Sequence, residues 1–180
     1  MNKITPAAGQ KLMRSPDIMR ALLSKAGPAK WHDEDVYCLA DQAAAVGAAL
    51  VVAIHKHLNG ARIGYLFRKK LSGRDRITLA KASIVSAKLE FFSDLDFIVE
   101  LNWDAWMHLE PHQRVALVDH ELCHFGVDRT GETTKHVLIS HDLEEFGAIV
   151  KRWGLWKQDV AEFGGIVREQ LDLLAGKGPA

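Results

Sequence analysis

The sequence predicts a mixed α+β protein with one folded domain. Three observations predict it: an apolar stripe of helical spacing between residues 39 and 58, a strand-rich stretch from 63 to 101, and a second helical repeat after Pro111. A chain of 180 residues can bury one sizeable core but is short for two. We therefore expect an N-terminal arm over residues 1–30 and a single domain over 31–176.

The charge balance argues against partners that bind by electrostatic attraction. The chain has 23 basic and 23 acidic side chains, so no net field draws it to nucleic acid or to an anionic membrane. The amino terminus lacks the apolar run of a signal peptide, and the longest apolar stretch, residues 43–54, is too short to span a bilayer. We expect a cytoplasmic protein with no membrane partner and no nucleic-acid partner.

The two cysteines, Cys38 and Cys123, do not form a recognisable disulfide framework. This usage fits a reducing compartment. Because Cys123 lies inside an otherwise helical repeat, we expect it to be a small buried apolar residue.

Helix-breaking residues and the spacing of apolar residues predict the first elements of the chain. Residues 1–30 contain prolines and glycines and little periodicity, which indicates an arm or a short helix laid on the domain. A helix is predicted to begin after Trp31, in the acidic residues 33–35, and to end near Lys56. Its basic end carries His55 and His57, which we expect to be solvated. The predicted apolar stripe consists of Leu39, Ala43, Val46, Leu50, Ile54 and Leu58.

Strands are predicted next. Ile63, Tyr65 and Phe67 alternate with polar or small residues, as in a half-buried strand. Residues 77–86 and 97–101 are predicted to form two further strands, separated by turn signals. The large side chains of Trp103 and Trp106, which follow, are expected to pack in the core.

The central helix is predicted to start near Pro111 and to end near Gly126. At 100° per residue, His120 and His124 lie together on the side opposite the apolar residues. Ala116 and Leu117 share the side of the histidines, which is unusually apolar for a fully solvated face. The opposite, core-facing side consists of Val115, Val118, Leu122 and Phe125.

Three C-terminal segments complete the prediction. An extended run over residues 133–139 leads into an acidic cluster at 141–146, which suits the start of a helix. A last helix is predicted after Gly154. Its apolar face consists of Trp156, Val160, Phe163, Val167, Leu171 and Leu174.

The central helix contains the pattern H-E-x-x-H at residues 120–124, which indicates a zinc-dependent hydrolase. Two histidines four residues apart lie about one turn apart and can reach the same metal ion. Zinc lowers the pKa of a bound water from about 15.7 towards 7. We expect Glu121 to be the general base, which accepts the proton of this water and passes it to the leaving amine.

A catalytic zinc normally takes three protein ligands, so a third is needed. We choose His141, which follows a predicted strand and precedes a predicted helix. A carboxylate from Glu144 or Glu145 is the second choice, and His136 the third. The expected metal ligands are therefore His120, His124 and His141.

Supporting residues are less defined by the sequence. Asp119, Asp128 and Asp142 are candidates for orienting the ligand imidazoles, although ordinary polar or capping roles are commoner for such residues. Tyr65 and His136 are candidates for stabilising the oxyanion.

The chain resembles the phage metallopeptidases, small proteins of phages and prophages. The residues that carry this resemblance are L-V-D-H-E-L-C-H-F at 117–125 and H-D-L-E-E-F-G-A-I-V-K-R-W-G-L-W at 141–156. The resemblance covers about residues 35–156 and leaves out the last helix. A more distant similarity to SprT-like zinc peptidases, where a downstream histidine completes the site, supports His141. The resemblance implies a zincin-like α+β fold, in which a small antiparallel sheet packs with the active-site helix and flanking helices and one strand borders the cleft.

The leading function is thus a zinc metallopeptidase that acts on a protein or peptide substrate, such as a host or phage protein. One alternative is a catalytically inactive, zinc-stabilised module that binds a host factor. Structural zinc sites prefer several cysteines, and only one is near. A three-histidine metal-dependent ribonuclease is less favoured, because a nuclease usually has a more basic surface.

Overall fold

The computed structural model confirms the α+β class. It describes residues 12–23, 37–69, 71, 78–131, 134–141, 153, 155 and 158–175. Residues 11–139 form one compact unit, and the described residues from Ser140 onward belong to a second. The expected domain boundary at residue 30 falls outside the described residues and stays a prediction.

The first unit is built on a four-stranded sheet of order β1-β2-β4-β3. Its strands are β1 (Tyr37–Leu39), β2 (Ile63–Arg68), β4 (Phe97–Asn102) and β3 (Ala80–Ile84). The pairings β1–β2 and β3–β4 are antiparallel, whereas β2 and β4 run parallel, so the sheet is mixed. A parallel pair needs a crossover, and the segment containing β3 supplies it. β3 is left at the edge.

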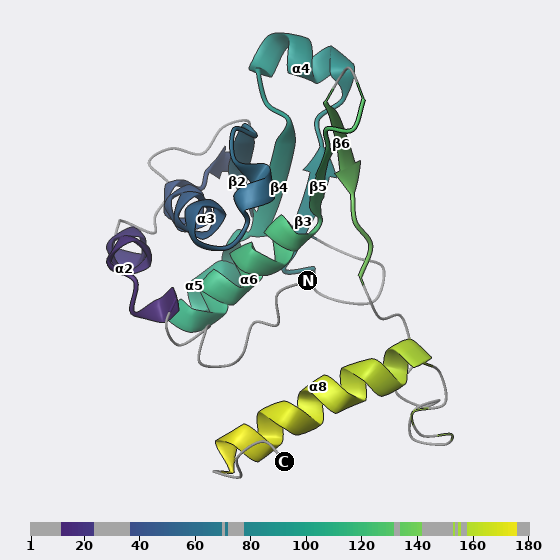
Figure 1. Ribbon diagram of the computed structural model, residues 1–180. Coiled ribbons are helices and arrows are strands. Elements are labelled where there is room, and N and C mark those ends of the chain that lie inside the picture. The colour runs from purple at the N-terminus through teal and green to yellow at the C-terminus, as the bar shows by residue number, and fades with distance from the viewer. Residues whose placement is uncertain are drawn as a thin grey trace. The chain divides into compact units, whose positions relative to one another are not determined.

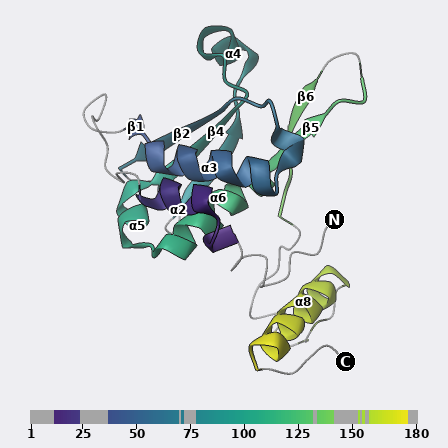
Figure 2. The ribbon, with the colours of Figure 1, turned by 60° about the vertical axis from the view of Figure 1, so that its left-hand side comes forward.

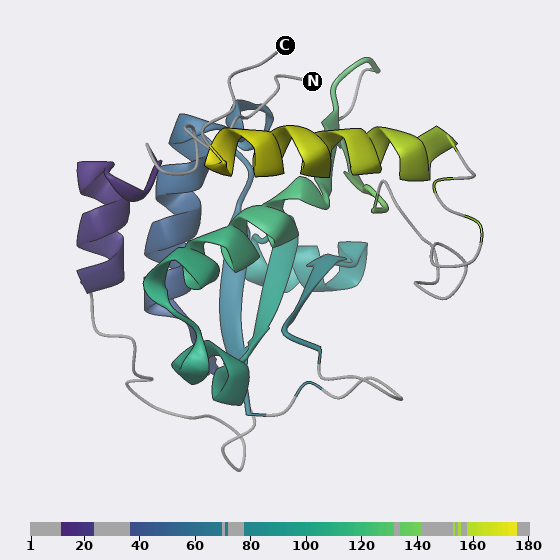
Figure 3. The ribbon, with the colours of Figure 1, turned by 90° about the horizontal axis from the view of Figure 1, so that it is seen from below.

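Two helices cover one face of this sheet. α3 (Asp41–Ala53) contacts β2, α6 (Pro111–Cys123) contacts β3, and the two helices contact each other. Alternate strand residues such as Phe67, Val99 and Leu101 are buried beneath them, as the two-residue period of a strand requires. α2 (Pro16–Leu23) lies beside α3 with Ile18 and Ala21 buried, so the N-terminal region does contain a short helix laid on the domain (Figure 2). Figure 3 shows α2 and α3 side by side at the left, next to α6.

Shorter elements surround this centre. α4 (Ala87–Ser93) connects β3 to β4 and stands beyond their ends, at the top of Figure 1. α5 (Trp103–His108) follows β4 directly, and β5 (Phe125–Asp128) follows α6. β5 pairs antiparallel with β6 (Lys135–Leu138) as a separate two-stranded sheet. A short 3-10 helix, η1 (Lys56–Leu58), follows α3 and contacts β5.

The buried amide of Gln42 holds four helical segments together. Its nitrogen donates to the carbonyl of Leu22 at the end of α2 (2.8 Å). Its oxygen accepts from the Trp106 indole of α5 (3.2 Å) and from the Arg114 guanidinium of α6 (3.1 Å). Because a buried amide is costly unless its atoms are hydrogen-bonded, these contacts fix how α3 meets the start of α6.

Several predictions are wrong in detail. The first helix does not begin after Trp31, because residues 37–39 form the edge strand β1 and α3 begins at Asp41. Hydrogen bonds to β2 place these three residues in the sheet, a partnership that local periodicity cannot reveal. α4, α5 and β5 were not predicted. Cys123 is exposed rather than buried, and the buried cysteine is Cys38.

In the second unit, α8 (Gln158–Leu174) confirms the predicted last helix. The helix predicted from the acidic cluster at 141–146 lies outside the described residues. Among the described residues, no helix combines the length and apolar composition that a membrane span requires.

Close packing of α3 on β2 leads to a stability prediction at Gly47. A Cβ added there would overlap the ring of Tyr65, whose buried hydroxyl has no hydrogen-bond partner among the described residues. We expect Gly47→Ala to lower the free energy of unfolding by about 1–3 kcal/mol, although alanine favours helices. Tyr65→Phe removes the nearest atom and should partly rescue the loss, as measured by denaturant unfolding. A stabilising Gly47→Ala would contradict this packing.

Candidate metal centre and active site

The helix that carries the H-E-x-x-H pattern has clear start and stop signals. Pro111 occupies its first turn, and the Gln113 side chain accepts from the Glu110 backbone N–H at 2.9 Å. α6 ends at Cys123, and His124 is its C-cap residue, immediately before β5. The second histidine therefore lies where the chain turns from helix into strand.

The two sides of α6 have different surroundings, as its sequence predicts. Val115, Val118 and Leu122 are buried in the core. On the other side His120 is exposed and His124 is partly buried. The apolar side anchors the helix, so the histidines are presented on a rigid element.

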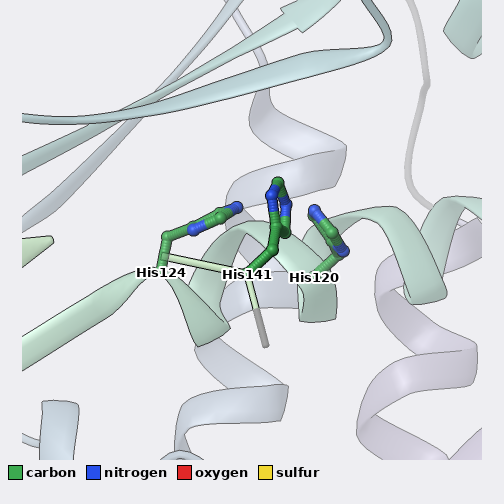
Figure 4. Close-up of side chains that lie close together, drawn as sticks. All are labelled: His120, His124 and His141. Atoms are coloured by element: carbon green, nitrogen blue, oxygen red, sulfur yellow. The ribbon is translucent and has the colours of Figure 1, made fainter. Parts of the chain in front are cut away.

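The structure brings the three predicted metal ligands together. Each of His120, His124 and His141 offers a ring nitrogen, and these atoms all lie within 4.8 Å of one another. Figure 4 shows the three rings gathered at the end of α6. Imidazole nitrogens are the commonest ligands of catalytic zinc, and three of them leave one coordination position for water or substrate.

Two hydrogen bonds connect His124 to the end of the second sheet. The Ile139 backbone N–H donates to the His124 carbonyl (2.8 Å), and His124 Nδ1 lies 2.7 Å from the Ile139 carbonyl. Because a carbonyl only accepts, Nδ1 carries the proton. In neutral imidazole this leaves the lone pair of Nε2 for a metal. Ile139 is two residues before His141, so the same contact anchors the chain that leads to the third histidine.

The Glu121 side chain of α6 is buried on the side of the edge strand β3, with 4% of its surface exposed. Burial raises the pKa of its carboxyl, while the charge of His124 and a hydrogen bond from the Ala82 backbone lower it in part. A carboxylate shielded in this way is a stronger base than one in water.

A groove runs between α6 and β3 beside this glutamate. Its β3 side contains Leu79 and Ala80, and its α6 side contains Ala116 and Leu117 next to His120. The Val85 N–H donates to the Asp96 backbone carbonyl, and the Leu79 carbonyl accepts from the Asn102 N–H. The peptide groups of Leu79 and Val85 therefore point towards β4. Since peptide groups alternate along a strand, those of Ala80 and Ala82 point away from β4, at the edge of the sheet where the groove begins.

The other candidate residues lie elsewhere. His136 is on β6, its ring against Phe97 and its Nδ1 4.0 Å from Asp96, and it does not belong to the three-histidine group. Asp128 accepts hydrogen bonds from Thr130 in a turn. The Tyr65 hydroxyl lies against Gly47 of α3, away from the groove. Asp142, Glu144 and Glu145 lie outside the described residues.

The expectation of solvated histidines after α3 is wrong for His55 and confirmed for His57, which is exposed. His55 is 7% exposed, and its Nε2 lies 2.6 Å from Asp119 Oδ1. The ring of His57 bonds to the Phe125 carbonyl (3.0 Å). Among the described residues, Asp119 therefore pairs with His55, which follows α3, and not with one of the predicted metal ligands. Only the contact between α3 and α6 brings these residues together, so no local pattern could have revealed it.

The family comparison agrees with this geometry. The model of a family described as "Putative phage metallopeptidase" matches residues 36–168, most of the chain. The chain belongs to this family. No curated protein and no solved structure matches it.

The family match covers more of the chain than the earlier resemblance does, and it implies a metal cofactor. It begins at the start of β1, as expected, but continues past residue 156 into α8, which the resemblance had left out. A metallopeptidase family implies a metal cofactor, and the three-histidine group has a donor set that suits one.

Proposed function

We propose that this protein is a zinc metallopeptidase that hydrolyses peptide bonds, with His120, His124 and His141 as ligands and Glu121 as general base. The observation that carries this proposal is the convergence of three imidazoles beside a buried glutamate and a groove. Family membership supports the reaction class.

Zinc suits this donor set better than the hard cations do. Mg²⁺ and Ca²⁺ take oxygen ligands, whereas the group offers three ring nitrogens, one of them oriented by the Ile139 carbonyl. When bound, zinc would supply a water of lowered pKa and polarise the scissile carbonyl.

The residues of the chain would do the remaining work. Glu121 would accept the proton of the attacking water and deliver it to the leaving nitrogen, so that no proton is lost between the two steps. Its burial keeps bulk water from competing for the carboxylate. The Ala82 hydrogen bond holds that carboxylate next to β3.

The groove favours an extended polypeptide as the substrate. Because the Ala82 N–H donates to Glu121, the Ala80 peptide group is the part of β3 that would pair with a peptide laid along the strand, while the alanine and leucine side chains would contact substrate side chains. We propose a protein or peptide substrate, from host or phage, cleaved in the cytoplasm of a host cell by a phage- or prophage-encoded enzyme.

Glu121→Gln tests the general base. The amide cannot accept the proton, so we expect cleavage of a peptide library to fall by about 10²–10⁴-fold. Zinc content should stay unchanged, because the side chain is not a ligand. Full cleavage by the variant would contradict the mechanism. Retained zinc without cleavage by the native chain would favour the inactive binding module.

His141→Ala tests the third ligand. Loss of one of three ligands should weaken zinc binding by more than about 100-fold, measured by competition with a chelating dye. His136→Ala, which removes an imidazole outside the group, is the matched control and should bind zinc as the native chain does. Normal zinc binding by His141→Ala, with loss in Glu144→Ala or Glu145→Ala, would replace His141 by a carboxylate.

Ala116→Trp tests the groove. Ala116 is exposed and lines the groove on α6, so an indole there should hinder a peptide while leaving the metal ligands intact. We expect kcat/KM to fall at least about tenfold with unchanged zinc content, mainly through KM. His112→Trp, at an exposed α6 position outside the groove, should cleave normally. Equal activity of both variants would place the substrate elsewhere.

A further inference from the structure

A second group of potential metal ligands lies on another side of α6. Asp119 and Cys123 are four residues apart, and each directly precedes one of the predicted zinc ligands, His120 and His124. One residue corresponds to 100° around a helix, so the two pairs occupy neighbouring sides. His55, which follows α3, completes this group. Its ring nitrogen, a carboxylate oxygen of Asp119 and the Cys123 sulfur all lie within 4.8 Å of one another.

The surroundings of these residues are graded from buried to exposed. His55 is 7% exposed and its Nε2 lies 2.6 Å from Asp119 Oδ1, while Asp119 is partly buried and Cys123 is exposed. The simplest interpretation is a hydrogen-bonded histidine–aspartate pair that joins α3 to α6. The Cys123 sulfur lies within 4.8 Å of both donor atoms and adds a third kind of donor beside the pair.

We propose that His55, Asp119 and Cys123 form a second metal site, which binds Zn²⁺ independently of the three-histidine site. Nitrogen, oxygen and sulfur are the three donor types that zinc accepts, at about 2.0–2.3 Å. A thiolate and an imidazole disfavour Mg²⁺ and Ca²⁺, which prefer oxygen. The exposed side of Cys123 leaves a fourth position for water.

Binding at this site has a simple proton balance and a structural consequence. The metal would displace the thiol proton of Cys123, which is released to solvent, and would bind the neutral ring of His55 through the nitrogen that carries no proton, while the other ring nitrogen keeps the single ring proton. The ion would connect the end of α3 to the last turn of α6. His120 lies in that turn and His124 directly follows it, so the second ion would hold in place the backbone that carries two ligands of the first ion.

Cobalt substitution tests the proposal directly, because only one of the two sites contains sulfur. A thiolate bound to Co²⁺ gives a charge-transfer absorption in the near ultraviolet, whereas a three-histidine site gives none. We expect the full chain to bind about two equivalents of Co²⁺ and to show this band. Cys123→Ala should lose the band and bind about one equivalent of Co²⁺ less. His55→Ala should weaken the band and lower the affinity for that equivalent. Circular dichroism checks that each variant folds.

Two controls separate this site from the proposed catalytic one. Cys38→Ala changes the only other cysteine, which is buried in β1, and should keep the band. The double variant His120→Ala/His124→Ala should also keep the band while it loses the other equivalent. A single equivalent without the band in the native chain would overturn the proposal and leave the histidine–aspartate pair alone. A band that survives His55→Ala but disappears in the double variant would assign Cys123 to the first site instead.

Discussion

The reciprocal hydrogen bonds between His124 and Ile139 are the constraint on which the site depends. They join His124 at the end of α6 directly to Ile139, the residue after β6, although the β5–β6 hairpin separates the two residues in the chain. The same contact fixes the proton of the His124 ring on Nδ1 and directs Nε2 towards the other imidazoles. The contact therefore constrains both the orientation of the His124 ring and the position of the chain that leads to His141.

α6 performs several tasks because its residues are distributed around its axis. Val118 and Leu122 anchor it in the core, Glu121 is buried against β3, and the two pairs of potential ligands occupy the remaining directions. A helix fixed on one side holds the others at set angles. The position of its start is determined separately, through Arg114 and the buried amide of Gln42.

The sequence predicted those features that depend on local spacing. The start of α6, the strands β2, β4 and β6, and the pairing of His120 with His124 follow from periods of 3.6 and 2 residues and from proline at the helix start. The end of α6 was predicted near Gly126, but the helix ends at Cys123 and Phe125 begins β5. β1 and the parallel β2–β4 pairing depend on partners far along the chain, and so does the contact between His55 and Asp119. His141 could be chosen by residue type, but its proximity to His120 depends on the β5–β6 hairpin, and β5 was not predicted.

The burial of Glu121 links the fold to the chemistry. Burial of the Glu121 carboxylate raises its pKa, and His124 and a hydrogen bond from the Ala82 backbone at the sheet edge offset this rise only in part. A metal held by the neighbouring imidazoles would add positive charge on the same side and counteract the rise in the Glu121 pKa that burial causes. The edge strand β3 therefore has two roles in the site. It lines the groove, and its backbone holds the carboxylate that we propose as the base.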